Sequence, residues 1–297
     1  MSKKIAFVTS AVKPGFADND LYAVDVLQSA GAKVEPLPWD AGDAAWNSFD
    51  FVVIRSCWNY HLLPDKFLQW IEKMQKDGVK VFNPLNIVRW NLHKSYLQDL
   101  ESKGISIPPT IWIEKGGKAD LSSLLKKNGW SKAVVKPAIS ATAFNTFLVS
   151  PEANQQQKEF EELLGQADLL IQKFMTEVQE EGEWSLIFFN KKFSHAVIKQ
   201  PAKKDFRVQN DFGGTAQEAH PPAFVLGQAK KIIDLIDEPL LYARVDGVIS
   251  ENRFVLMELE LIEPMLFLGE SSGETFANAI ANHLTKGDEK MIVKAVG

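Results

Sequence analysis

The segment Val255–Pro264, VLMELELIEP, combines the pattern of a buried strand with two acidic residues. At the two-residue period of a strand, Met257 and Leu259 share one face, while Glu258 and Glu260 share the other. Two like charges side by side in a partly buried place cost free energy. The pattern therefore predicts that another group compensates the negative charges of these two carboxylates.

A third carboxylate is expected beside them. The apolar runs that flank the sequence SENR predict an antiparallel hairpin, and a loop centred on Asn252 places Asp246 opposite Glu258. Three carboxylates on one face repel each other, and a hard divalent cation with oxygen ligands relieves that repulsion. Mg²⁺ fits best, because it takes one or two protein carboxylates and completes its shell with water and phosphate. An exposed sheet face with solvated glutamates is the alternative that the pattern leaves open.

Basic residues able to neutralise phosphate end or interrupt apolar strands. Lys136 stands at the end of SKAVVKP, Lys199 ends FSHAVIK, and Lys94 lies at the entry to the middle of the chain. Arg207 follows in a polar loop, where a Gly-Gly pair can place backbone N–H groups against an anion. Each lysine alone is typical of a surface, but together they indicate a phosphate site.

A second candidate pocket follows the apolar strand in FVVIRSCWNYH. In open α/β sheets, ligands bind beyond the carboxyl ends of the strands. Arg55, Trp58, Asn59 and Tyr60 are therefore candidate substrate contacts, and Arg55 suits a carboxylate. Packing against the neighbouring unit is the alternative for the two aromatic residues. Cys57 is not expected to be a nucleophile, because no third group marks an orienting partner.

The elements that must position these residues predict an α/β protein with three units. Residues 1–88 alternate strand and helix patterns, as βαβ units on an open parallel sheet do, and two prolines place residues 33–39 at its edge. Residues 89–174 and 175–297 combine helices with strands, and one hairpin is expected to turn at Asn190 and Lys191. The predicted domains are therefore 1–88, 89–174 and 175–297.

Composition narrows the function classes. The net charge of -5 and the pI near 5.7 argue against a nucleic-acid partner. The single cysteine excludes an intrachain disulfide and a cysteine-based zinc cluster, so a reducing, cytoplasmic location is expected. No apolar stretch approaches the ~20 residues needed to span a bilayer, so no membrane partner is expected.

From about residue 91 to 268 the chain resembles the ATP-grasp superfamily. The likeness is closest to carboxylate–amine ligases of the glutathione-synthetase and ribosomal-S6-modification type, whose relatives include the cycloserine-forming cyclo-ligase. It rests on motifs in the family's order, namely NLHK, GISIPPT, VVKP, LLIQKFM, GEWS, DFRVQNDFGGT, VDG and ELE. The resemblance implies an α+β ATP-grasp fold in which two lobes enclose ATP and the N-terminal domain lies on the substrate side.

The resemblance also implies a role for each motif. The carried-over residues are Lys94, Lys136, Ser140 and Thr142 for the ATP phosphates; Gln172, Lys173 and Phe174 for adenine; Glu183 for the ribose; Lys199, Arg207 and Asn210 for the transferred phosphate or the acyl substrate; and Asp246, Glu258 and Glu260 for Mg²⁺, with two ions expected.

This sequence departs from the family pattern in two places. The family often has Asn where this chain has Glu260, so the expected metal site is more acidic. The lid after Lys136 reads SATAFN, residues Ser140–Asn145, without the usual glycines. Hydroxyls and small residues there can still close over phosphate.

Three hypotheses follow for function. The first is an ATP-dependent ligase that activates a small amino-acid-like or peptide-like carboxylate as an acyl phosphate and joins it to a nitrogen nucleophile. The second is intramolecular ring closure by the same chemistry, as in cycloserine formation. The third, motivated by the glycine-free lid, is a nucleotide-binding regulatory protein without turnover. Similar enzymes are commonly homodimers, and the sequence leaves the oligomeric state open.

Overall fold

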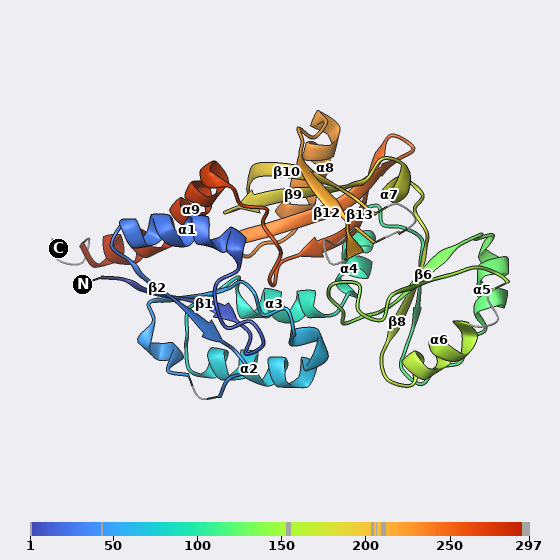
Figure 1. Ribbon diagram of the computed structural model, residues 1–297, viewed down its shortest axis with the longest axis horizontal. Helices are drawn as coiled ribbons and strands as arrows, with labels where there is room; N and C mark the ends of the chain where they lie inside the picture. The colour runs from blue at the N-terminus through green and yellow to red at the C-terminus, as the bar shows by residue number, and fades with distance from the viewer. Residues whose placement is uncertain are drawn as a thin grey trace.

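The computed structural model describes residues 2–42, 44–152, 156–202, 205, 207–208 and 212–292, with side chains up to residue 284. It shows three sheets with helices packed around them (Figure 1). The N-terminal sheet is parallel with the order β2-β1-β3-β4. Its strands and the helices and 3₁₀ turns around them are β1 Lys4–Thr9, α1 Asp18–Ser29, β2 Lys33–Pro38, η1 Trp46–Ser48, β3 Phe51–Ile54, η2 Tyr60–Leu62, α2 Pro64–Lys76 and β4 Val81–Phe82.

The sequence pattern explains this parallel sheet. Strand β3 is apolar throughout and buried throughout, as a strand covered on both faces must be. Helix α2 buries Phe67, Trp70, Ile71 and Met74, which recur at helical spacing. The proline-bearing strand β2 lies at the edge, as predicted, because proline has no N–H for a second neighbour.

The middle sheet is antiparallel with the order β5-β8-β6-β7. Helix α5 begins where the Asp120 side chain accepts a hydrogen bond from the Ser123 backbone N–H and ends at the left-handed Gly129. The elements of this lobe are β5 Thr110–Ile113, α5 Leu121–Asn128, β6 Ala133–Pro137, β7 Phe147–Val149, α6 Gln156–Leu164 and β8 Leu169–Lys173.

The large sheet is also antiparallel, with the order β11-β10-β9-β12-β13. As predicted, the hairpin between β9 and β10 turns at Asn190 and Lys191, both at positive φ. The elements of this lobe are α7 Glu177–Glu180, β9 Glu183–Phe189, β10 Lys192–Gln200, β11 Thr215–Glu218, α8 Ala223–Asp234, β12 Tyr242–Ser250 and β13 Arg253–Glu260.

A β-bulge sets the register of β12 and β13. Asp246 lies opposite Glu258, as expected, but the turn residues are Glu251 and Asn252, and the register shifts by one residue beside Asp246. Met257 therefore does not share a face with Leu259, contrary to the strict alternation expected from the sequence. Leu259 packs in the main core, whereas Met257 packs with a smaller cluster beside the cavity.

Two short helices cover the free edge of β13. They are α3 Leu85–Leu92 and α4 Tyr96–Ser102. The Asn91 side chain donates a hydrogen bond to the Leu259 carbonyl and accepts one from the Leu261 N–H, at 2.8 and 2.9 Å. The Tyr96 hydroxyl accepts a further bond from the Leu259 N–H. These bonds satisfy backbone groups at the sheet edge and hold the segment between the helices against the acidic face.

Core residues of the N-terminal lobe and of the C-terminal lobe pack together in one cluster, whereas the middle lobe has a cluster of its own. Helix α9, Glu270–Ile292, packs against α1 (Figure 1). One hydrophobic cluster joins residues of β1, α1, β9, β12 and α9. The middle lobe has a cluster drawn only from residues 111–171. Among the described residues, no helix is both long and apolar enough to cross a bilayer.

Candidate functional site

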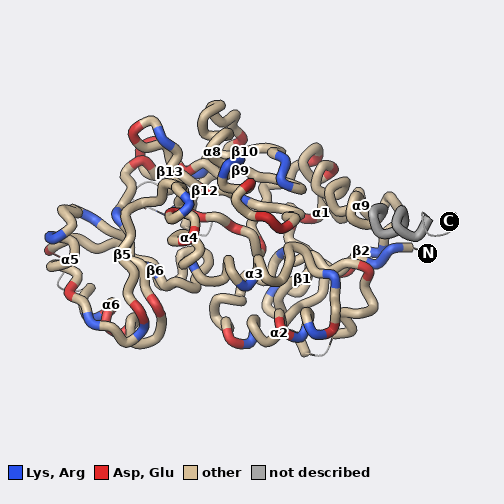
Figure 2. Tube along the Cα trace, turned by 180° about the vertical axis from the view of Figure 1, so that it is seen from behind, with Lys and Arg blue, Asp and Glu red and all other residues tan. Residues whose placement is uncertain are grey.

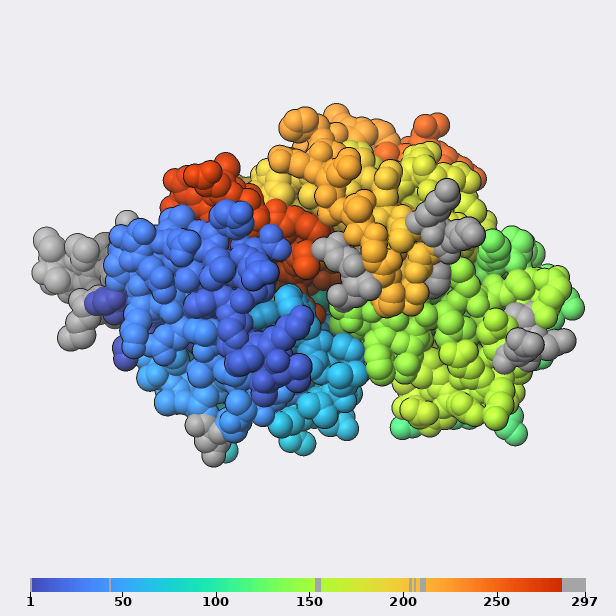
Figure 3. All heavy atoms as spheres, viewed as in Figure 1, coloured from blue at the N-terminus to red at the C-terminus, as the bar shows by residue number. Residues whose placement is uncertain are grey.

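A cavity of about 700 Å³ lies where the three lobes meet. This volume is within the range of sites that hold cofactors and small ligands. The space-filling view shows a notch between the N-terminal lobe and the green middle lobe (Figure 3). Lysine and arginine lie close to aspartate and glutamate around β12, β13 and α4, near the middle of the chain trace (Figure 2).

Asp246 on β12 forms the most enclosed part of the acidic face. Its carboxylate accepts hydrogen bonds from Ser185 at 2.6 Å, from Lys199 at 3.1 Å and from Arg244 at 2.9–3.1 Å. Burial alone would raise the pKa of Asp246, but Arg244 and Lys199 together lower it to about 2. Asp246 is therefore ionised and held in one orientation.

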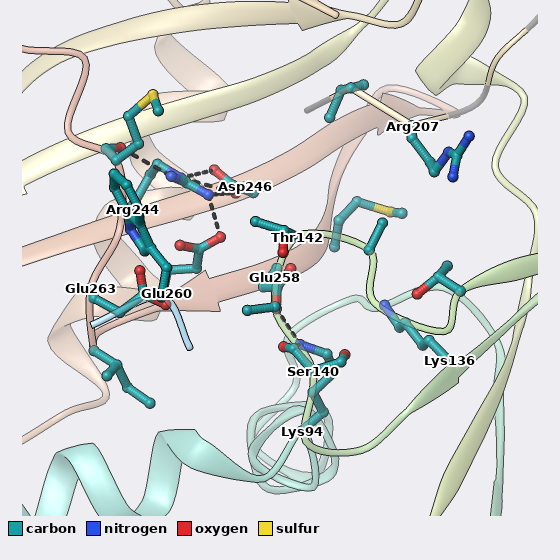
Figure 4. A pocket seen from close by; sticks show the side chains of 18 of the residues that line it. Lys94, Lys136, Ser140, Thr142, Arg207, Arg244, Asp246, Glu258, Glu260 and Glu263 are labelled. Carbon is teal, nitrogen blue, oxygen red and sulfur yellow. Dashed lines mark hydrogen bonds and ion pairs between the residues drawn. The ribbon is translucent and has the colours of Figure 1, made fainter. Parts of the chain in front are cut away.

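The two glutamates of β13 each have a cationic partner of their own. Glu258 accepts a hydrogen bond from Lys94, and Glu260 accepts one from Arg244 (Figure 4). Burial opposes the charge on Glu258, but Lys94 and Lys136 lower its pKa. For Glu260, burial and the neighbouring carboxylates Asp246 and Glu258 outweigh the attraction of Arg244 and raise the pKa.

Lys136 on β6 faces this acidic group from the middle lobe and lines the cavity (Figure 4). Within the described residues it forms no ion pair. Burial lowers its pKa to about 8, against the attraction of Glu258. On β10, Lys199 is paired with Glu183 at 2.6 Å as well as with Asp246. Of Lys94, Lys136 and Lys199, Lys136 is thus the one without an ion-pair partner in the described part of the chain.

The loop after Lys136 turns without glycine. Thr142, Ala143 and Asn145 all adopt positive φ, the left-handed region that usually favours glycine. The Ser140 carbonyl accepts a hydrogen bond from the Lys94 ammonium, and the Ser140 hydroxyl donates to the Pro137 carbonyl. Ser140 and Thr142 both line the cavity, so this loop borders the region of the two lysines (Figure 4).

The other residues expected at the nucleotide also border the cavity. Gln172 and Lys173 end β8, Phe174 follows them, and all three line the cavity together with Glu183. Arg207 lines the cavity as well and is paired with Asp205 at 2.9 Å. Asn210 lies outside the described residues. The structure thus gathers the described members of the nucleotide set around one cavity.

Arg55 does not lie where it was expected. Its side chain is 3% exposed, pairs with Asp20 at 2.9 Å, donates to the Pro264 carbonyl and does not line the cavity. Arg55 does follow the end of β3, as predicted. However, Asp20 on α1 and the Pro264 carbonyl enclose its guanidinium group. In this structure the Arg55 guanidinium is therefore engaged in a buried ion pair and does not face the cavity.

The aromatic residues after Arg55 do reach the cavity. Trp58, Asn59 and Tyr60 line it on the side of the N-terminal lobe. The Asn59 amide accepts from the Trp39 indole and donates to Asp40, so its main bonds hold the loop. Tyr60 is buried, and burial together with Glu263 raises the pKa of its hydroxyl.

Arg244 and Glu263 are charged cavity residues that the sequence reasoning missed. Arg244 lies two positions before Asp246, and at the period of a strand this places both side chains on the same face, so the spacing in ARVDG could have revealed it. Glu263 follows β13 and also lines the cavity. Its strand has ended by that point, so no periodicity predicts its direction.

The acidic face offers the type of oxygen donor that Mg²⁺ prefers. Asp246, Glu258 and Glu260 supply hard oxygen atoms on one face of a rigid strand pair. In the described part of the chain, no three His, Cys, Asp or Glu residues are grouped closely enough to form a metal cage on their own. Mg²⁺ does not require such a cage, because it keeps water and phosphate ligands.

Comparisons of the sequence with known proteins find relatives of one kind. Residues 5–83 match the family model described as the N-terminal domain of D-cycloserine synthetase DcsG. The chain is 27% identical to the cycloserine biosynthesis protein DcsG of Streptomyces lavendulae over 301 residues, covering 94% of this chain and 98% of that protein.

Solved structures show the same fold. The crystal structure of D-cycloserine synthetase DcsG matches with a TM-score of 0.82 and 26% identity, over 95% of this chain and 99% of that one. The D-alanine–D-alanine ligase of Bacillus anthracis, solved in complex with ATP, matches with a TM-score of 0.68 and 14% identity, over 98% of this chain and all of that one.

Proposed function

The chain is an ATP-grasp ligase related along its length to cycloserine synthetase, and from this premise we propose that it closes a carbon–nitrogen bond within one small amino-acid-like substrate. The observation that carries the proposal is the face of β12 and β13, where three carboxylates meet lysine and arginine side chains in one cavity. Ring closure is favoured over joining two substrates because residues 5–83, on the proposed substrate side, match the synthetase's own N-terminal domain.

We assign the ligands to the lobes by the residues that each lobe supplies. The nucleotide lies between residues 89–174 and 175–297, with adenine at Gln172, Lys173 and Phe174 and its ribose at Glu183. The substrate lies toward domain 1–88, where Trp58 and Tyr60 line the cavity. The phosphate tail then extends from Lys136 toward Lys94 and Glu258, along the order of these side chains in Figure 4.

The first chemical step is attack of a substrate carboxylate oxygen on the γ-phosphorus of ATP, which breaks the bond to ADP and gives an acyl phosphate. Lys94 and Lys136 neutralise phosphate charge, and the loop with Ser140 and Thr142 covers it. Bound at Asp246, Glu258 and Glu260, Mg²⁺ would neutralise phosphate oxygens and orient them; we propose two ions.

In the second step a nitrogen of the same molecule attacks the acyl carbon, the bond from that carbon to the phosphate oxygen breaks, and the proton lost by the nitrogen leaves with the phosphate. We propose that Arg244 and Lys199, which are held by hydrogen bonds to Asp246, stabilise the negative charge that develops on the acyl oxygen. Arg207 and Asn210 are proposed to act on the transferred phosphate. The product equals the substrate less one water, with ADP and phosphate released.

The test is ADP release from ATP over a panel of amino acids and amino-acid derivatives, followed by product mass spectrometry. Ring closure predicts ADP release with a single substrate and a product lighter by the mass of one water. A requirement for two substrates would replace ring closure by an intermolecular ligase. ATP binding without ADP release for any substrate would favour the regulatory hypothesis instead.

A further inference from the structure

Glu263 is a carboxylate that the catalytic scheme leaves unused. It follows β13, its side chain is 8% exposed, and it lines the cavity. Within the described residues no hydrogen bond or salt bridge satisfies it, whereas Glu258 and Glu260 both have cationic partners. Figure 4 shows Glu263 beside Glu260, at the end of the acidic group remote from Lys136.

Two guanidinium groups act electrostatically on Glu263, but neither forms a hydrogen bond with it. Arg244 bonds to Asp246, Glu260 and the Met265 carbonyl. Arg55 bonds to Asp20 and to the Pro264 carbonyl through Nε and Nη2, and its Nη1 is buried without a hydrogen-bond partner. Both cations therefore stabilise a negative charge on Glu263 electrostatically, but neither donates a hydrogen bond to its carboxylate oxygens.

A buried carboxylate without a partner costs free energy, which a protein avoids unless a ligand supplies the partner. Burial and the Glu260 carboxylate raise the pKa of Glu263 well above its ordinary value. A substrate group that carries a positive charge would reverse this penalty. A neutral or negative group would leave it in place.

The surroundings of Glu263 place it at the substrate end. Tyr60 and Ile262 line the same cavity, and Tyr60 lies close enough that Glu263 adds to burial in raising the pKa of its hydroxyl. The phosphate lysines lie at the other end of the acidic group (Figure 4). A substrate whose carboxylate meets the γ-phosphate near Glu258 would extend its remaining groups toward Glu263.

We propose that Glu263 binds the protonated amine of the substrate, so that the enzyme accepts carboxylates bearing an ammonium group and rejects the same acids without it. This inference rests on the proposed function, because it needs a substrate that lies across the acidic face. It names a specificity residue and a charge requirement, which the ligase chemistry alone does not demand.

Matched pairs of acids test the proposal by binding. The enzyme, loaded with ADP and Mg²⁺, is titrated calorimetrically with D-alanine, D-serine and D-cycloserine and with their analogues propionate, 3-hydroxypropionate and isoxazolidin-3-one, which lack the amine. A charge-assisted hydrogen bond corresponds to about 10- to 100-fold in affinity. We expect at least one amine-bearing probe to bind that much more tightly than its analogue, and Glu263→Gln to remove the difference.

A control variant shows whether the carboxylate at position 263 itself causes the preference for amines. Glu263→Asp keeps a carboxylate at this position and is expected to keep a preference for amines that Glu263→Gln loses. Unfolding temperature and ADP affinity of Glu263→Gln are measured alongside, and both are expected to match the wild-type protein or exceed it.

The proposal is overturned if no amine-bearing probe binds more tightly than its analogue, if Glu263→Gln leaves the ratio unchanged, or if Glu263→Asp removes the preference as completely as Glu263→Gln does. Failure of the proposed function has a different signature. In that case the amine preference depends on Glu263, but no substrate releases ADP.

Discussion

Lys94, in the link between α3 and α4, donates a hydrogen bond to Glu258 on β13. This contact joins the acidic face of the large sheet to the first of the proposed phosphate lysines (Figure 4). The Lys94 backbone N–H also bonds to the Ala138 carbonyl at 2.8 Å, just after β6. One residue thus connects the strand that bears the acids with the loop proposed to cover phosphate.

Glu258→Gln tests the role of that carboxylate. We expect substrate-dependent ADP formation to fall by at least about 100-fold, because a neutral amide stabilises neither the metal nor the transferred phosphate's charge as a carboxylate–metal pair does. The fold should remain, since the Gln oxygen still accepts from Lys94. ADP formation and thermal unfolding are measured, with Glu251→Gln in the exposed hairpin turn as the control. Undiminished turnover contradicts the assignment.

The pH dependence of ATP binding tests Lys136, whose pKa burial lowers to about 8. Phosphate binds the charged form, so affinity is full below pH 8 and falls as the pH rises above it, by up to about tenfold per unit. Lys136→Arg keeps its charge over this range and should flatten the profile. Calorimetric titration with ATP and Mg²⁺ between pH 7 and 9.5 measures the effect. A flat wild-type profile would contradict phosphate binding by a lysine whose pKa is lowered to about 8.

Magnesium alone is expected to bind weakly. Asp246 and Glu260 are engaged by Arg244, and Glu258 by Lys94, so a free ion must displace cations that are already in place. Millimolar Mg²⁺ should leave the unfolding temperature unchanged, while Mg²⁺ with ATP should raise it, and a chelator should reverse that rise. Arg244→Met, which uncovers two carboxylates, should let Mg²⁺ stabilise the protein without nucleotide. A large shift by Mg²⁺ alone in the wild type would argue against this order of binding.

The pair Arg55–Asp20 should matter for stability. Removing one member of a buried ion pair leaves an uncompensated charge and costs about 3–5 kcal/mol of unfolding free energy. Arg55→Met and Asp20→Asn should each show such a loss in denaturant unfolding, and the double variant should lose less than the sum. If Arg55→Met instead raised KM without loss of stability, the substrate role first expected for this residue would be restored.

Much of the fold was predictable because strong local patterns met no competing contact. The parallel N-terminal sheet, the edge position of β2 and the hairpin at Asn190 follow from apolar runs and turn residues. The opposition of Asp246 and Glu258 was also predicted, although it depends on a bulge that strict alternation does not contain.

Arg55, which was expected to line the cavity, and Glu263, which was not predicted, have positions that local sequence patterns do not determine. Arg55 sits where a strand end should open to ligand, but Asp20 and Pro264, 35 and 209 residues away, enclose it. The direction of Glu263 is set by a segment without regular structure. Neither fact is encoded in the local spacing from which the site was inferred.

The packing of α9 against α1 determines which part of the molecule can swing. Through this contact the N-terminal lobe and the C-terminal lobe bury apolar residues against each other. Separating these two lobes would therefore expose apolar surface. The lobe of β5–β8 keeps its own cluster within residues 111–171 and can pivot with the least such exposure. Nucleotide entry and exit should therefore proceed by a hinge of that lobe over an otherwise rigid base.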